Sequence, residues 1–161
     1  MRDKIIAAAI DSLRTEGLKF SVDTIAAKLK ISKKTIYKFF PDKETLAYAI
    51  YEEYYRNAMD RVKEMEESGN QIRVPLLMVY QDASFMIRSE IFNKYQLNES
   101  VSSYVSKLQD ELWPRIISLI APSAPRTEHV MDRAIVEGAF ENAVKYAIPP
   151  EQMAERLGNV L

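Results

Sequence analysis

The chain has 161 residues, of which 47% are apolar and 28% charged, and a formal net charge of −1. This length suits one or two small domains, and this apolar content can bury a core without metals or disulfides. The absence of cysteine excludes a disulfide framework, thiol catalysis and cysteine-ligated zinc. No stretch of about 18 residues is free of charge, and the N-terminus lacks the apolar core of a signal peptide. We therefore expect a cytoplasmic protein without a membrane span.

Charge is distributed unevenly along the chain. Residues 1–44 hold ten Lys and Arg against six Asp and Glu, a charge of +4, whereas residues 45–161 hold twelve against seventeen, a charge of −5. A basic segment joined to an acidic one is expected where one end of a protein meets phosphate. Two solvated surfaces could differ in this way by chance, so charge alone does not establish nucleic-acid binding.

Apolar residues recur at helical spacing along nearly the whole chain, and the alternation typical of strands is absent, which predicts an all-α fold. The first helix is expected over residues 2–16. The second follows the N-cap Ser21 and ends in a tight turn at Lys30-Ile31, because a serine hydroxyl can satisfy a free backbone N–H at a helix start. The third spans residues 33–39 after the N-cap Ser32.

A long fourth helix is expected from Lys43 to about Glu67, with Asp42 as its N-cap and Ser68-Gly69-Asn70 as its end. Its inner positions are spaced by three or four residues, as one face of a helix requires. They are Leu46, Ile50, Tyr54, Ala58, Val62 and Met65.

The rest of the chain is also predicted to be helical. The helices are expected at residues 72–88, 90–95, 98 to the loop at Pro122, 127–147, and from 150 to the end. The helix over 72–88 is apolar on most sides, which is typical of the middle of a bundle. Pro114 should bend or split the helix that contains it, because proline removes a helical hydrogen bond.

Residues 21–43, SVDTIAAKLKISKKTIYKFFPDK, place two short helices around a tight turn. Packed on a preceding helix, such a pair forms a helix-turn-helix, whose second helix enters the DNA major groove. The residues expected to hold the two helices together are Ile25, Ala26, Leu29, Ile31 and Ile36. The exposed positions of the second helix carry cations, a hydroxyl and a ring that suit phosphates and base edges. Its aromatic residues could instead be core, and its lysines a solvated face.

The string from Ile25 to Leu46 resembles the N-terminal domain of TetR-family repressors, and its most specific part is the run Tyr-x-Phe-Phe-Pro-x-Lys that ends at Lys43. The resemblance covers about the first 46 residues. It implies a DNA-binding head over residues 1–44 and an effector-binding and dimerisation body over residues 45–161. It also implies that the third helix reads DNA and that the fourth links head to body.

Carried over by position, the resemblance implies the residues that contact DNA. Ser21 would bind phosphate at the start of the second helix, and Lys43 would clamp a phosphate with help from a helix N-terminus. The groove and backbone would be faced by Lys33, Lys34, Thr35, Tyr37 and Lys38. The family usually has glycine where this chain has Lys30, so we expect a lysine at positive φ there, strained by roughly 1–2 kcal/mol.

The resemblance also implies an effector pocket in the body. Aromatic residues and methionines with a few polar groups could line a flat apolar pocket that adapts to its ligand. The candidates are Tyr54, Met78, Tyr80, Gln81, Phe85, Met86, Tyr104, Leu108 and Trp113. Each of them could equally be an ordinary core residue.

Small residues recur in the helix over 127–147, where they would let two helices approach closely. They include Ala134, Gly138, Ala139 and Ala143. We therefore predict that residues 127–161 form a homodimer interface. A dimer is also expected because two copies related by a two-fold axis can read both half-sites of a palindrome. Members of the family are commonly longer, so we expect the last helix to be short or incomplete.

The resemblance thus implies a transcriptional regulator, by the family's default a repressor, released from a palindromic operator by a small apolar or amphipathic effector. We expect no catalytic residue, metal or cofactor, because the chain has one histidine, His129, and no phosphate-loop, zinc-protease or nucleophile-elbow motif. The alternative is a helical adaptor that no longer binds DNA, or a regulator without a small-molecule effector. The lysines of the third helix argue against the adaptor.

Overall fold

The computed structural model describes residues 1–16, 21–69, 75–78 and 99–160, and every regular element in them is a helix. The helices are α1 (Arg2–Glu16), α2 (Val22–Leu29), α3 (Lys33–Phe39), α4 (Lys43–Ser68), α7 (Glu99–Ile120), α8 (His129–Lys145) and α9 (Pro150–Gly158). The predicted all-α class is confirmed. The helix predicted over 72–88 is described only at 75–78, where the chain is helical, and the one over 90–95 lies outside the described residues.

Serine side chains cap the starts of α2 and α3. The Ser21 hydroxyl accepts a hydrogen bond from the Thr24 N–H at 3.2 Å, and the Ser32 hydroxyl accepts one from the Thr35 N–H at 3.1 Å. Each bond satisfies an N–H that the first turn of a helix leaves without an intrahelical partner, and such a cap contributes about 1 kcal/mol. Both predicted N-caps are confirmed.

Lys30 ends α2 in the left-handed conformation, with φ 54° and ψ 42°. The Ile31 N–H donates to the Ala26 carbonyl at 3.0 Å, and the Lys30 N–H donates to the Ala27 carbonyl at 3.1 Å. This pair of bonds satisfies two of the last carbonyls of α2 and turns the chain toward α3. The positive φ predicted for Lys30 is therefore confirmed.

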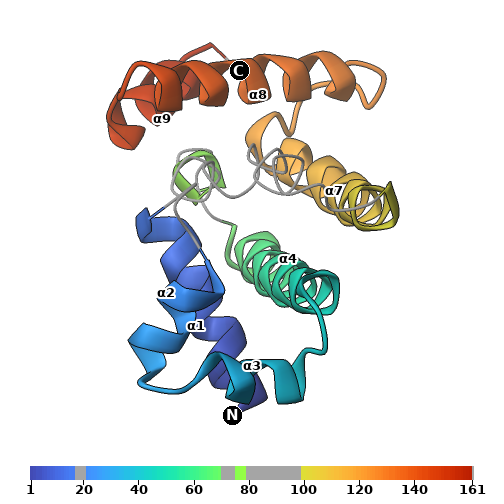
Figure 1. The fold of residues 1–161 in the computed structure, drawn as a ribbon. Helices are drawn as coiled ribbons and strands as arrows, with labels where there is room; N and C mark the ends of the chain where they lie inside the picture. The colour runs from blue at the N-terminus through green and yellow to red at the C-terminus, as the bar shows by residue number, and fades with distance from the viewer. Residues whose placement is uncertain (17–20, 70–74, 79–98, 161) are drawn as a thin grey trace.

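Helix α4 packs against both α1 and α7, and Figure 1 shows it between them. The six inner positions predicted from the spacing of apolar residues are all buried. They belong to one continuous cluster of buried side chains that extends from α1 through α4 to α7, α8 and α9. The head and the body therefore share a core, and α4 contributes to both ends of it.

Helix α7 continues through Pro114 without a break, so the predicted split does not occur. Trp113, Ile116 and Ile117 are buried on either side of the proline. Burying such side chains contributes about 1.5–3 kcal/mol each, whereas an internal proline costs about 3 kcal/mol or more. Packing of α7 against the core thus outweighs the one helical hydrogen bond that is lost.

Helices α8 and α9 form an outer layer at the end of the molecule opposite α3 (Figure 1). Helix α8 was expected over 127–147 but is two residues shorter at each end. It is followed by Ala147 at φ 51°, and the Ile148 N–H donates to the Ala143 carbonyl at 2.9 Å. Pro149 and Pro150 then start α9. None of the described helices is both long and apolar enough to cross a membrane.

Replacing Lys30 with glycine is expected to stabilise the protein by about 1 kcal/mol, because glycine adopts the left-handed conformation without steric cost. Part of the relief is offset by the greater freedom of the unfolded chain. Lys38→Gly is the matched control, since it removes the same charge from a helical position of α3, and it should destabilise by about 1 kcal/mol. Urea denaturation measures the free energy of unfolding of both variants. A lower value for Lys30→Gly than for the native chain would contradict this account of the turn.

Candidate nucleic-acid interface

Helix α3 has one exposed side and one buried side. Ile36 is fully buried, and Thr35 is half-buried above its hydrogen bond to Ser32. The remaining predicted contacts of the helix are all exposed, namely Lys33, Lys34, Tyr37 and Lys38. The structure therefore gathers the predicted cations and the tyrosine ring on a surface that a nucleic acid could reach, while Ile36 fixes the helix to the core.

The three aromatic residues at the end of α3 serve different purposes. Phe40 is buried, and the guanidinium of Arg2 lies 5.5 Å from its ring centroid, which ties the end of α3 to α1. Tyr37 and Phe39 are 39% and 41% exposed. The core interpretation of these residues thus holds for Phe40 alone. Phe39 is an interface candidate that sequence reasoning missed, although an aromatic directly before a buried one was a signal that the two could not share a face.

The start of α4 combines a capped helix terminus with a lysine. The Asp42 carboxylate accepts hydrogen bonds from the Thr45 N–H at 2.7 Å and the Thr45 hydroxyl at 2.8 Å. These bonds, the backbone one first, hold the pKa of Asp42 below its usual value. Lys43 is exposed at the first position of the helix. Its ammonium and the positive end of the helix dipole both suit a phosphate.

Among the described residues of the head, Lys33 and Lys28 pair with carboxylates. The Lys33 ammonium lies 2.6 Å from an Asp23 carboxylate oxygen, and Lys28 forms a second pair with Asp11. The hydrogen bond that the Lys33 ammonium donates to Asp23, and the negative charge of that carboxylate, raise the pKa of Lys33. Lys34 makes no salt bridge with any residue that the structure describes. Sequence reasoning missed Asp23, which lies ten residues before its partner on a different helix.

Helix α4 meets α7 through polar and aromatic contacts at both ends. At its start, the Ser100 hydroxyl donates to the Glu44 carboxylate at 3.0 Å, and the rings of Tyr48 and Tyr104 meet edge to face with centroids 5.2 Å apart. At its end, the guanidinium of Arg115 donates to Glu66 at 2.9 Å and forms a second bond to the same carboxylate. We call these contacts the α4–α7 seam: Glu44–Ser100, Tyr48–Tyr104 and Glu66–Arg115.

The predicted effector-pocket residues fall into three groups. Tyr54, Met78 and Trp113 are buried in the core, whereas Tyr104 and Leu108 are half-buried. Tyr80, Gln81, Phe85 and Met86 lie outside the described residues. The structure thus neither assembles this set around a cavity nor separates it, and the pocket stays a prediction.

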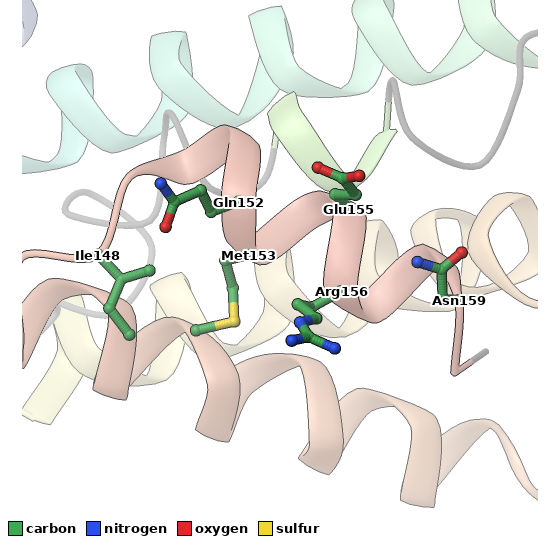
Figure 2. A pocket seen from close by; sticks show the side chains of 6 residues that line it. All are labelled: Ile148, Gln152, Met153, Glu155, Arg156 and Asn159. Atoms are coloured by element: carbon green, nitrogen blue, oxygen red, sulfur yellow. The ribbon is translucent and has the colours of Figure 1, made fainter.

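Two surface cavities lie elsewhere on the described part of the chain. One, of about 500 Å³, is formed by α9 and the turn before it, and Figure 2 shows its six lining side chains. The other, of about 570 Å³, lies between α1 and α4. Neither is lined by any of the predicted pocket residues that the structure describes. The described residues also contain no cluster of side chains suited to a metal ion.

The predicted dimer residues occupy two sides of α8. Ala134 is exposed and Gly138 is half-buried, whereas Ala139 packs partly against the core and Ala143 is buried in it. Small size does not indicate which way a helical residue faces, so the sequence could not separate them. Only Ala134 and Gly138 lie on the side of α8 that faces away from its own core.

Residues 5–50 match the family described as bacterial regulatory proteins, tetR family. This segment is therefore a DNA-binding domain of the TetR family. The matched segment contains α2, α3 and the first turns of α4, which confirms the resemblance noted in the sequence and identifies the helix-turn-helix as a DNA-binding one. A comparison with curated proteins finds no match. The TetR family is one of regulators, so α3 is assigned to DNA binding and the chain to transcription regulation.

Lys43 tests the phosphate contact expected at the start of α4 in this TetR-family head. Lys43→Ala should weaken binding to all duplex sequences by a similar factor and lower the steepness of the salt dependence by about one unit, because one phosphate contact is lost. Lys63→Ala is the matched control, since it removes the same charge from the far half of α4, where Lys63 lies 3.9 Å from Asp60. Fluorescence anisotropy over a salt series measures both, and an unchanged slope for Lys43→Ala would refute the contact.

Proposed function

We propose that this TetR-family regulator is a cytoplasmic repressor that binds a palindromic operator as a homodimer and leaves it when a small apolar or amphipathic effector binds the body. The observation that carries the proposal is the exposed face of α3. A helix anchored by Ile36 presents lysines, a hydroxyl and a tyrosine ring beside two capped helix starts. Such a face can bind phosphates for affinity and base edges for specificity.

Each position of this face has a proposed part in the complex. The DNA phosphate backbone would be contacted by Ser21, Lys33, Lys34 and Lys38. Base edges in the major groove would be contacted by Thr35 and Tyr37. Helix α3 has seven residues and can contact few base pairs. Two copies related by a two-fold axis, with their recognition helices about 34–36 Å apart, would read both halves of a palindrome.

The proposed dimer surface lies on the outward side of α8. Met131 and Ile135 are 60% and 47% exposed, and with Ala134 and Gly138 they form an apolar stripe spaced by three and four residues. An exposed apolar stripe of this kind marks an interaction surface, and its small residues would let a second copy of α8 approach closely. Because α8 lies at the end opposite α3 (Figure 1), a dimer formed there leaves both heads free for DNA.

The α4–α7 seam supports the proposed effector response. An effector that binds the body better in one arrangement of α7 would raise the population of that arrangement. The free energy of this shift cannot exceed the difference between the effector's binding free energies for the two arrangements. The contacts at Glu44 and Tyr48 lie in the first two turns of α4, directly after the recognition helix. A displacement of α7 would therefore reach the part of α4 that positions the head.

Selection of binders from a pool of random duplex DNA, followed by sequencing, tests the proposed function. A palindromic motif is expected, because a two-fold dimer presents two identical recognition helices. Fragments that carry the motif can then be used to screen small apolar compounds for release. Enrichment without symmetry would refute the dimeric readout, and no enrichment at low salt would favour the alternative of a helical adaptor.

Ile135→Glu tests the dimer surface. A carboxylate on the outward stripe of α8 should raise the dimer dissociation constant at least about tenfold, equivalent to about 1.4 kcal/mol. Val144→Glu is the matched control, because Val144 is also exposed on α8 but lies off the stripe. Sedimentation velocity measures the oligomeric state and circular dichroism the retained helicity. A native chain that remains monomeric, or equal effects of the two substitutions, would refute this surface.

A further inference from the structure

Asp23 is an acidic residue at the edge of the head that would face DNA, and the proposed DNA contacts assign it no role. It lies in the first turn of α2, and its carboxylate contacts Lys33 in the first turn of α3 at 2.6 Å. The contact joins the two helices of the helix-turn-helix. Lys33 is itself one of the proposed phosphate contacts, and Ser21, another of them, lies two residues before Asp23.

The fold does not depend on this ion pair. The side chains of Lys33 and Asp23 are 54% and 68% exposed, and exposed pairs contribute little to stability because solvent screens them. The start of α2 is already capped by Ser21, and that of α3 by Ser32. The helices are held together by buried side chains such as Ile25 and Ile36. The ion pair between Asp23 and Lys33 is therefore expected to affect DNA binding and not folding.

On that surface the pair changes the charge that a phosphate meets. Lys34 and Lys38 make no salt bridge with the described residues, whereas Lys33 already has a carboxylate within hydrogen-bond distance. A phosphate at Lys33 would lie within a few ångströms of Asp23, well inside the screening length of about 8 Å at physiological salt. Lys33 can therefore bind a phosphate only by leaving Asp23 or by sharing its ammonium between two anions.

We propose that Asp23 is an internal competitor for the DNA phosphate at Lys33, and that it lowers the affinity of the head for every duplex. The free energy gained from a phosphate contact at Lys33 is offset by the free energy lost when Lys33 leaves Asp23. The head therefore binds DNA as if it had about one fewer phosphate contact. Because phosphate contacts carry no sequence information, the competitor weakens operator and random DNA by the same factor. The hydrogen bond that Lys33 donates to Asp23 stabilises the ammonium form and raises the pKa of Lys33.

The test compares Asp23→Asn with the native chain on a short duplex of arbitrary sequence, by fluorescence anisotropy over a salt series. Removing the competitor should steepen the salt dependence by about one unit, which corresponds to roughly tenfold tighter binding near 0.1 M salt. Asp11→Asn is the matched control, because Asp11 also pairs with a lysine of α2 and the net charge changes equally. A gain as large in Asp11→Asn would show an effect of net charge alone and overturn the proposal.

A second substitution separates competition from direct repulsion. In a Lys33→Met chain, Asp23→Asn should change the affinity little, because the contested ammonium is gone. A full gain in that background would mean that the carboxylate repels DNA by itself, and weaker binding by Asp23→Asn in the native background would mean that it positions Lys33 for DNA. Either result overturns the proposal. Asp23→Ser, which keeps a residue suited to a helix start, replaces Asp23→Asn if that chain does not fold.

This inference rests on the DNA-binding face of the proposed function, but not on the palindrome, the dimer or the effector. A selection without a palindromic motif leaves the test on an arbitrary duplex unaffected. If the native chain binds duplex DNA and Asp23→Asn binds no more tightly, the inference alone fails. If neither chain binds any duplex, the proposed function fails and the inference falls with it.

Discussion

The burial of one face of α4 against both α1 and α7 is the constraint on which the rest of the structure depends. Helices α2 and α3 have eight and seven residues, too few for stable isolated helices in water. They persist because Ile36 and Phe40 enter the same cluster of buried side chains as Leu46 and Ile50 at the start of α4. The orientation of α3 toward DNA is therefore set by a helix whose other half belongs to the body.

Helices α2 and α3 of the head could be predicted to the residue because local interactions determine where they begin and end. Ser32 bonds to an N–H three residues later, and the bonds around Lys30 span at most five residues. The ends of α8 could not be predicted as well. Glu128, directly before α8, makes no side-chain cap, and the left-handed residue after the helix is Ala147, a type that rarely signals such a turn. Where capping residues are absent, apolar spacing alone leaves the ends of a helix undefined.

The candidate site shows the same division between local and non-local information. The exposed lysines of α3 follow from helical periodicity once Ile36 is assigned to the core. The pair between Asp23 and Lys33 does not, because it depends on the angle at which α2 and α3 meet. Ala143 and Gly138 are both small residues, yet Ala143 is buried and Gly138 is half-buried on the outward side, since the two positions lie on different sides of α8. Contacts between elements thus require the packed structure, even where every element is predicted correctly.

The α4–α7 seam has the strength that a reversible response requires. An edge-to-face ring pair such as Tyr48–Tyr104 contributes about 0.5–1.5 kcal/mol, and an exposed hydrogen bond such as Glu44–Ser100 contributes about 1 kcal/mol or less. Coupling free energies between two sites are typically about 1–3 kcal/mol. An effector could therefore offset the contacts at the start of α4 while the buried stripe of that helix stays in place. Helix α4, with 26 residues, is roughly 39 Å long, so a small tilt about its end near Glu66 would become a larger displacement at its start, beside the recognition helix. In the proposed response, a weak seam on a firmly buried helix would thus let the head change position without unfolding the core that holds it.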